Sequence, residues 1–315
     1  MQKVLVTGGA GFIGSHTAAQ LVREGFEVVI LDDFNDYYDP RQKELNVTPL
    51  VQAGVRVERL DIRDAEKLEA VVAREKPQTI VHLAARAGVR PSIENPLLYE
   101  EVNVRGTMHV LEAARRAGVP QFVFASSSSV YGASADSPFS EDQTVDYPVS
   151  PYAATKKAGE LLAYTAHHLY GLKTTCLRFF TVYGPAGRPD MAPYLFTEAI
   201  AQGRPIKRFG DGSSQRDYTY IDDIVAGVVA AVRHPFDYEI INLGNHQTVS
   251  LNRFIEVIED VVGKKAIIEA YPEQPGDVPL TYANIEKAKR LLGYEPQTSI
   301  EEGMKKFVEW WEQRS

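Results

Sequence analysis

The chain has 315 residues, of which 44% are hydrophobic and 24% charged, and its formal net charge at pH 7 is −8. This is the balance of a globular protein, and no block of lysine and arginine gives an electrostatic case for nucleic acid. The single cysteine, Cys176, excludes an internal disulfide, and nothing supports a metal site. Since no signal peptide or bilayer-spanning apolar stretch is evident, we expect a soluble cytoplasmic protein without a membrane partner.

The first half of the chain alternates short β-branched runs with helical patterns. Six runs are apolar nearly throughout, as in a parallel sheet buried on both faces: Lys3–Thr7, Glu27–Leu31, Arg56–Leu60, Thr79–Leu83, Gln121–Ala125 and Thr174–Phe180. Helical patterns between them cover Phe12–Glu24, Ala65–Arg74 and Leu97–Ala117. This alternation predicts an α/β fold with a doubly wound parallel sheet of the Rossmann type.

After about Val182 the pattern becomes irregular and is interrupted by proline and glycine. Helices are predicted at Asp222–Arg233, Asn252–Val262 and Ile300–Trp311. We expect the later segments to form a smaller C-terminal α/β lobe over the carboxyl edge of the sheet. The predicted division assigns residues 1–181 and about 218–247 to the sheet domain, and residues 182–217 and 248–315 to the lobe.

A glycine-rich motif, Gly8-Gly9-Ala10-Gly11-Phe12-Ile13-Gly14, follows the first predicted strand and opens a helix within a βαβ unit. In this context Gly8 permits the tight turn, Gly11 lets the backbone approach a pyrophosphate, and Gly14 allows the helix to pack closely on the strand. The free N–H groups and the positive dipole end at the start of the helix favour phosphate. The motif therefore predicts a dinucleotide site.

Acidic residues follow the second and third predicted strands. At Asp32 and Asp33 a carboxylate can accept both adenosine ribose hydroxyls and would repel a 2′-phosphate, which favours NAD over NADP. Asp61 and Ile62 are placed to meet the adenine. The alternative for Asp61 is a helix cap before Asp64.

A tyrosine and a lysine open a later helix, in which Ser150 is a plausible N-cap and Pro151 fits the first helical position. Tyr152 and Lys156 then lie one turn apart on the same face. A free tyrosine has a pKa near about 10, and a neighbouring ammonium or an oxidised nicotinamide lowers that pKa. The pair can take a proton from a substrate hydroxyl while hydride leaves for NAD; the alternative is a chance surface pair.

Four serines, at positions 126–129, follow the fifth predicted strand. Their hydroxyls lie at the carboxyl end of the sheet, where open α/β sheets bind ligands. One of them can bridge the reacting hydroxyl and the oxygen of Tyr152. The alternative is a flexible serine-rich loop.

The order of several stretches resembles a known family. TGGAGFIG, HLAARAGVR, SSSSVYG, YAATK, RFFTVYGP and RDYTYIDD follow one another as in the extended short-chain dehydrogenases/reductases that act on nucleotide sugars, the NAD-dependent epimerase/dehydratase family. The resemblance covers nearly the whole chain. Within the family it is strongest to the UDP-glucuronate 4-epimerases, through SPYAATKKAGE, LRFFTVYGPAGRPDMA, QRDYTYIDDIV and GDVPLTYANI.

The resemblance implies roles for individual residues. The catalytic residues would be Ser127, Tyr152 and Lys156, and Asn103 would be a structural polar residue near the active helix. Arg216 and Asp277 would hold the uridine diphosphate. The residues implied to contact NAD are Gly8, Gly11, Phe12, Ile13, Gly14, Asp32, Asp33, Asp61, Ile62, Leu83, Ala84, Ala85, Tyr152 and Lys156.

The expected reaction is redox-neutral: a 4-keto sugar forms, turns in the pocket and takes the hydride back on its other face. In a uronic acid this ketone is β to the carboxylate, and such acids lose CO₂ readily, so the carboxylate must be held away from the reactive geometry. By resemblance Ser128, Ser129, Thr181 and Arg188 would hold it, since arginine binds carboxylates through a bidentate fork. Arg90 is a second candidate, and the alternative for Arg188 is a surface salt bridge.

The same positions weigh against other activities. Nucleotide-sugar 4,6-dehydratases carry Asp-Glu where Ser128 and Ser129 stand, and uronate decarboxylases typically carry a glutamate in this region. Galactose epimerases usually have asparagine at the position of Thr181 and arginine at that of Gln274, so the chain departs from them at both.

We therefore predict a UDP-glucuronate 4-epimerase with bound NAD that interconverts UDP-glucuronate and UDP-galacturonate. The alternatives are a UDP-glucose/UDP-galactose 4-epimerase, a UDP-glucuronate decarboxylase, and a catalytically silent NAD-binding regulatory protein. The family resemblance also implies a homodimer in which the Leu97–Ala117 and Tyr152–Tyr170 helices of two copies pack as a four-helix bundle.

Overall fold

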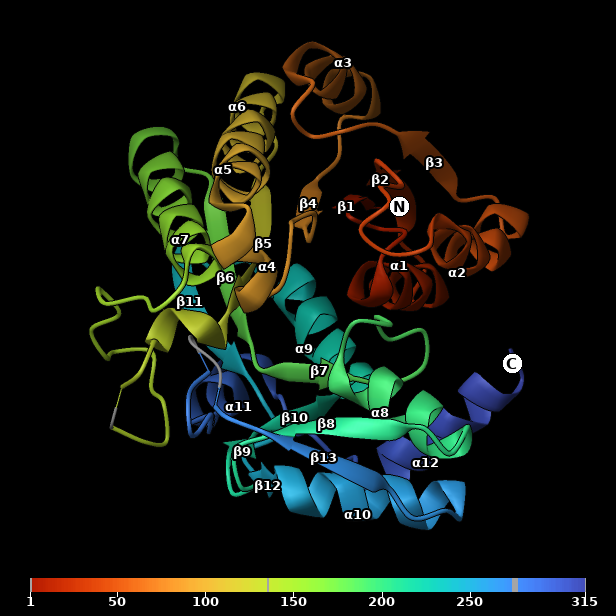
Figure 1. Ribbon diagram of the computed structural model, residues 1–315. Coiled ribbons are helices and arrows are strands. Elements are labelled where there is room, and N and C mark those ends of the chain that lie inside the picture. Colours follow the sequence, from red (N-terminus) through yellow and green to blue (C-terminus); the bar gives the residue numbers. More distant parts are fainter. Residues whose placement is uncertain (1, 135, 274–276, 315) are drawn as a thin grey trace.

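The computed structural model describes residues 2–134, 136–273 and 277–314 and contains a central sheet of parallel strands (Figure 1). The strand order is β11-β6-β5-β4-β1-β2-β3, which is the predicted doubly wound arrangement. The strands are β1 Lys3–Thr7, β2 Glu27–Asp32, β3 Arg56–Arg59, β4 Thr79–His82, β5 Gln121–Ser127, β6 Lys173–Phe179 and β11 Tyr238–Leu243. The order reverses between β1 and β4, so a ligand crevice is expected at the carboxyl ends of these strands.

The inner strands contribute side chains to two hydrophobic cores, because successive residues of a strand point to opposite faces of the sheet. Leu5, Ile80 and Phe122 belong to the core beneath one helical layer, and the neighbouring Val4 and Val81 belong to the core beneath the other. The helices of the first layer are α3 Ala65–Glu75, α6 Thr107–Ala117 and α7 Pro151–Tyr170; those of the second are α1 Phe12–Arg23, α2 Pro40–Gln52 and α9 Ile221–Arg233. The described ranges contain no helix that is both long and apolar enough to cross a membrane.

The predicted helix Leu97–Ala117 is confirmed as one helical stretch, but part of that stretch is not α-helical. The chain forms α4 Val89–Glu94 and α5 Pro96–Tyr99, and then a π-helical segment, Glu100–Gly106, leads into α6. Within the π segment Asn103 Oδ1 accepts a hydrogen bond from Arg86 N at 2.8 Å, and Asn103 Nδ2 donates to Arg86 O at 2.9 Å. The wider π turn accompanies an inward-facing amide, as is common for π-helical turns near functional sites.

A smaller lobe lies below the sheet in Figure 1 and is built from pairs of short strands. The pairs are β7 Thr181–Tyr183 with β10 Tyr218–Tyr220, β8 Pro205–Phe209 with β13 Ile267–Tyr271, and β9 Gln215–Arg216 with β12 Val249–Ser250. Its helices are α8 Ala192–Ala201, α10 Leu251–Val262 and α12 Ile300–Glu312, while α11 Glu286–Leu292 packs back against α9 and β11. The sequence predicted α10 and α12 of this lobe but neither α8 nor the strands. Four of these strands, β7, β9, β10 and β12, have only two or three residues, too few to show alternation.

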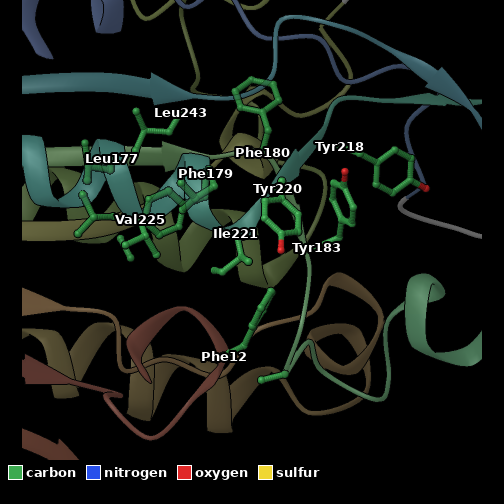
Figure 2. Close-up of a cluster of buried hydrophobic side chains, with 14 of the residues drawn as sticks. Phe12, Leu177, Phe179, Phe180, Tyr183, Tyr218, Tyr220, Ile221, Val225 and Leu243 are labelled. Carbon is green, nitrogen blue, oxygen red and sulfur yellow. The ribbon is translucent and has the colours of Figure 1, made fainter. Parts of the chain in front are cut away.

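An aromatic cluster joins the lobe to the sheet domain (Figure 2). The ring of Tyr183 meets those of Tyr218 and Tyr220 edge to face, with centroids 6.2 and 5.7 Å apart. Figure 2 shows Phe12, from α1, pointing towards Ile221 at the start of α9. Since these side chains are buried in one core, the two parts pack directly against each other beside the crevice. The division into residues 1–181 with 218–247 and the remainder stays a prediction.

Candidate active site

A single cavity of about 980 Å³ opens between the carboxyl ends of the strands and the lobe. Every residue that the sequence singled out for catalysis or ligand binding lies on its wall, whereas the structural Asn103 does not. The wall therefore includes Gly8, Gly11, Phe12, Ile13, Gly14, Asp32, Asp33, Asp61, Ile62, Leu83, Ala84, Ala85, Arg90, Ser127, Ser128, Ser129, Tyr152, Lys156, Thr181, Arg188, Arg216 and Asp277.

The glycine loop has the close approaches that the motif predicts. A Cβ atom on Gly8, whose φ is +67°, would lie 2.7 Å from Ala84 N, and one on Gly14 would lie 2.1 Å from Gly8 O. Neither position has room for a side chain. Gly11 is the N-cap of α1 and offers no capping side chain, so N–H groups in the first turn remain available to a phosphate.

Asp32 ends β2 as a buried carboxylate. Its Oδ2 accepts a hydrogen bond from Ala10 N at 3.0 Å, and its Oδ1 accepts one from Phe34 N at 2.9 Å. Lys43 is also buried; its Nζ lies 3.9 Å from Asp32 Oδ1 and donates to Asn35 O at 3.0 Å. Burial raises the pKa of Asp32, and the charge of Lys43 acts against this rise. Sequence reasoning missed Lys43, because a lysine in a helix usually lies on a solvated face.

The other two acidic residues have local partners. The exposed Asp33 accepts a hydrogen bond from Asn35 N at 3.1 Å. Asp61 accepts from Arg63 N at 2.8 Å and forms an ion pair with the Arg63 guanidinium at 2.6 Å. The cap of helix α3 is Asp64, so Asp61, which lies on the cavity wall, does not cap that helix.

Tyr152 and Lys156 lie one turn apart on α7, as predicted. Ser150 caps the helix, accepting a hydrogen bond from Ala153 N at 3.1 Å. Lys156 Nζ donates to Ala125 O, at the end of β5, at 2.8 Å and lies 5.9 Å from the centroid of the Tyr152 ring. The lysine thus ties the catalytic helix to the strand that carries the serines.

The electrostatics of Tyr152 differ from the sequence-based expectation. Burial raises the pKa of Tyr152, and the hydrogen bond with Ser127 and the charge of Arg188 lower it. Burial also lowers the pKa of Lys156 to about 8. The charge of Arg188 therefore favours the phenolate, and the positive charge of an oxidised nicotinamide would act in the same direction.

The serine-rich strand end is held by hydrogen bonds rather than being a flexible loop. Ser127 Oγ donates to Ser129 Oγ at 3.2 Å, at the start of a 3₁₀ turn. Ser126 is buried and donates to Glu160 Oε1 at 2.6 Å, and Glu160 forms a buried ion pair with Arg178 at 2.8 Å. A pair of opposite charges in the protein interior therefore fixes the strand beside Ser127.

The predicted carboxylate ligand Arg188 has a protein partner. Its Nε donates to Asp190 Oδ1 at 3.0 Å, and its Nη2 donates to Asp190 Oδ2 at 2.5 Å. Arg188 thus forms a salt bridge in which its own side chain is 18% exposed and that of Asp190 is 39% exposed. Both residues lie on the cavity wall, so the salt bridge leaves a role in ligand binding open. Thr181, at the start of β7, lies on the same wall.

Arg90 and Asp277 meet at another part of the cavity. Arg90 Nη2 donates to Asp277 Oδ2 at 2.7 Å, and its guanidinium lies 4.6 Å from the centroid of the Phe209 ring. Arg216 Nη1 donates to Gln215 O at 2.9 Å, and burial lowers the pKa of Arg216. Arg90 thus pairs with Asp277, one of the two residues that the resemblance implies for binding the diphosphate. Gln274, where the chain departs from the galactose epimerases, lies outside the described residues.

Comparison with known proteins gives the family. The family model described as GDP-mannose 4,6 dehydratase matches residues 5–307. The chain belongs to this family of extended short-chain dehydrogenases/reductases. A relative from Thermodesulfobacterium geofontis (strain OPF15), named UDP-glucuronate 4-epimerase, is 48% identical over 97% of this chain and 95% of its own length.

Two solved structures of family members are close in shape. UDP-glucuronic acid 4-epimerase from Bacillus cereus, in complex with UDP-glucuronic acid and NAD, superposes with a TM-score of 0.94 at 35% identity over 100% of both chains. UDP-glucose 4-epimerase from Thermotoga maritima, with UDP-glucose, gives a TM-score of 0.93 at 31% identity over 99% of both chains.

The protein also contains a buried chain of hydrogen bonds beside the cavity, which the sequence did not reveal. Thr107 Oγ1 donates to Asn103 O at 2.6 Å, so the Thr107 oxygen accepts from His82 Nε2, 3.0 Å away. His82 Nδ1, at 2.7 Å, then accepts from Thr7 Oγ1, which in turn accepts from Ala84 N at 3.3 Å. The stretch HLAARAGVR contains His82, but its partners are far away in sequence.

The same chain continues to the catalytic helix. Asn103 Nδ2 donates to Thr155 Oγ1 at 3.0 Å, and Thr155 Oγ1 donates to Tyr152 O at 2.8 Å. Asn103 thus has the structural role that the family resemblance implied: it connects the wall of the predicted dinucleotide site with the backbone of Tyr152.

Proposed function

We propose that the chain is a UDP-glucuronate 4-epimerase, which binds NAD and interconverts UDP-glucuronate and UDP-galacturonate. The observation that carries the proposal is the convergence of Ser127, Tyr152 and Arg188 on one cavity, which combines a base for a sugar hydroxyl with a cation for a carboxylate. The T. geofontis relative of that name and the B. cereus complex with UDP-glucuronic acid and NAD support it.

The residues of the dinucleotide part fit NAD. Close packing at Gly8 and Gly14 leaves the backbone free to approach a pyrophosphate, and the uncapped start of α1 offers N–H donors. A buried carboxylate at Asp32 suits ribose hydroxyls and disfavours a 2′-phosphate. When bound, NAD supplies the acceptor and then the donor of the hydride at C4.

Side chains of the protein transfer the proton. Tyr152 takes the proton of the C4 hydroxyl, Ser127 bridges that hydroxyl and the phenol, and Lys156 holds α7 against β5 through the Ala125 carbonyl. On return of the hydride to the opposite face of the sugar, Tyr152 gives the proton back. Because the net reaction is redox-neutral, the cofactor stays bound through the cycle.

A uronate must also keep its carboxylate through the 4-keto stage. Ser128, Ser129, Thr181 and Arg188 lie on the cavity wall and supply hydroxyl donors and one cation for that carboxylate. Held in this way, the C5–C6 bond stays out of alignment with the C4 ketone. Since serines occupy the positions of a dehydratase's acidic pair, elimination of water is not expected.

A UDP-glucose 4-epimerase is the second candidate, favoured by the T. maritima structure with UDP-glucose. A neutral hydroxymethyl group at C6 would leave the buried charge of Arg188 without a ligand partner, which argues for the uronate. The proposal also includes a cytoplasmic homodimer. The buried free thiol of Cys176 is of a kind that reducing compartments maintain.

The test is incubation of the purified protein with UDP-glucuronate and, separately, UDP-glucose, without added NAD, with products resolved by NMR. We expect UDP-galacturonate from the first. Conversion of UDP-glucose alone would replace the proposal with the second candidate, and CO₂ as the main product would make the chain a decarboxylase. In Arg188→Ala, turnover of the uronate should fall more than that of the neutral sugar; equal losses would remove the carboxylate role.

A further inference from the structure

Asp190 binds the guanidinium of Arg188 along one edge only, the edge formed by Nε and Nη2. Asp190 accepts from Nε and Nη2 in the side-on bidentate arrangement described above. Nη1 has no hydrogen-bond partner within the described ranges and is the nitrogen left for a ligand. Because Arg188 is largely buried, the carboxylate of Asp190 determines which edge of this charge faces the cavity.

Tyr37 supports the same pair from the loop after β2. Its ring lies 5.2 Å from the Arg188 guanidinium, and its Oη accepts from Arg188 Nη2 at 3.3 Å. Tyr37 Oη donates to Ala87 O at 2.9 Å, and the Tyr99 hydroxyl donates to the same carbonyl at 2.8 Å. We call Tyr37, Arg188 and Asp190 the arginine clamp; its residues come from two loops that are far apart in sequence.

The clamp adjoins the catalytic tyrosine. The ring of Tyr99 packs edge to face on that of Tyr152, with centroids 6.3 Å apart. The charge of Arg188 also lowers the pKa of Tyr152. The position of the guanidinium therefore matters both for a carboxylate on the sugar and for the phenol that takes the proton.

We propose that Asp190 is a positioning residue that sets the preference of the site for a uronate over a neutral sugar. It fixes Arg188 by the Nε–Nη2 edge and leaves Nη1 for the carboxylate of the sugar. Without Asp190 the long side chain would have to be ordered by the ligand itself, which weakens binding of the uronate specifically. This inference rests on the proposed UDP-glucuronate 4-epimerase activity.

An opposite role for Asp190 predicts the opposite sign. If its carboxylate competed with the substrate for the guanidinium, its removal would tighten uronate binding. If it only stabilised the loop before α8, its removal would weaken both sugars equally. The ratio of the two affinities therefore separates the three roles.

The experiment measures dissociation constants for UDP-glucuronate and UDP-glucose by calorimetry, in a Tyr152→Phe background that prevents turnover. Adding Asp190→Asn should weaken UDP-glucuronate on the order of tenfold, as for loss of a charged anchor, and change UDP-glucose by less than about threefold. Tyr37→Phe keeps the ring under the guanidinium and should give a smaller shift in the same direction.

The matched control is Asp39→Asn. Asp39 also pairs with an arginine two residues later, Arg41, but it is exposed and lies off the cavity wall. Because asparagine caps helices as well as aspartate, this variant should leave both affinities unchanged.

A second readout follows the product of the enzyme with Tyr152 intact. A loosely held carboxylate allows the C5–C6 bond of the 4-keto sugar to break: the electron pair passes into the C4 ketone as an enolate, CO₂ leaves, and C5 takes a proton from water. Asp190→Asn should therefore raise the CO₂ released per epimerisation. An unchanged affinity ratio, or tighter uronate binding, would overturn the role of Asp190. Failure of the wild type to epimerise UDP-glucuronate would instead overturn the proposed function.

Discussion

Tyr152 lies in surroundings that disfavour its ionised form, since burial raises its pKa. It becomes a useful base only when Ser127, Arg188 and a cationic cofactor ring offset that burial. In Tyr152→Phe the ring and its packing remain and the proton acceptor is lost. We expect turnover to fall by at least about a hundredfold, within the usual range for a general base, while NAD stays bound.

Measurement of UDP-galacturonate formation by NMR, together with NAD content after denaturation, checks this. Tyr147→Phe is the control, because Tyr147 is 84% exposed and lies off the cavity wall. Near-normal turnover of Tyr152→Phe would show that another group takes the proton.

His82 makes stability depend on acid pH. Burial lowers its pKa from 6.5 to about 3, whereas the unfolded chain takes up the proton near 6.5. The stability contributed by the neutral ring is therefore fully present above pH 6.5 and is lost as the pH falls towards 3. In His82→Gln the amide can keep contacts with Thr7 and Thr107 but does not titrate, so the free energy of unfolding should fall less steeply between pH 6.5 and 4.

Denaturant unfolding at several pH values measures this slope. His168→Gln, at an exposed position on α7, removes a histidine that lies outside this hydrogen-bond chain and should leave the steep dependence in place. If the free energy of unfolding falls equally steeply with pH in the wild type and in His82→Gln, His82 is not the group that causes the loss of stability.

At the scale of the elements, Asp217, just after β9, joins three segments of the chain. Its Oδ1 accepts from Asn245 N at 2.6 Å and from Thr219 Oγ1 at 3.1 Å; its Oδ2 accepts from His246 N and Ala283 N, both at 3.1 Å. Burial raises its pKa to about 6, so near neutral pH the carboxylate is charged and bound by four donors.

Asp217→Asn replaces one of these oxygens with an NH₂ group that faces backbone donors. Each unsatisfied buried donor costs about 1–3 kcal/mol, and in a chain of this size each kcal/mol lowers the melting temperature by roughly 2–4 °C. The side chain of the neighbouring Arg216, which lies on the cavity wall, should also change position, and this should raise the KM for the UDP-sugar. Differential scanning calorimetry and kinetics test both effects. Asp211→Asn, at an exposed loop position in the same lobe, should change neither.

Local motifs predicted the elements well where the cause is local. Gly8 and Gly14 are fixed by contacts within one βαβ unit, and Ser150, Tyr152 and Lys156 by the geometry of one helix start. The π-helical segment before α6 was missed because the hydrogen bonds that accompany it, from an inward-facing amide to a distant backbone, have no periodic signature in the sequence.

Across the whole molecule, what the sequence could not predict is which charged groups pair. Asp190 and Tyr37 meet at Arg188 although Tyr37 lies 151 positions away from it, and Lys43 reaches Asp32 from the next helix. Such pairs follow from how the lobe and the loops pack on the sheet. A motif can therefore place an arginine on the cavity wall without showing that a carboxylate of the protein already binds part of its guanidinium group.

The outer surface of the α5–α7 layer carries exposed apolar side chains that the monomer does not cover. Leu161 and Tyr164, on α7, are 55% and 49% exposed, Met108, on α6, is 40% exposed, and Leu97, on α5, is 74% exposed. Leu161 and Tyr164 are three residues apart and so share one face of α7. Exposed apolar side chains are typical of interaction sites, and these residues lie on the helices that the family resemblance assigns to a homodimer.

Leu161→Glu places a charge on this face of α7, where burial against a second copy would be costly. We expect the variant to be monomeric at concentrations at which the wild type sediments as a dimer, measured by analytical ultracentrifugation. Leu45→Glu is the control, since Leu45 is 53% exposed but lies on α2, in the opposite layer. A wild type that sediments as a monomer, or a Leu161→Glu variant that remains dimeric, would show that these helices do not form the interface.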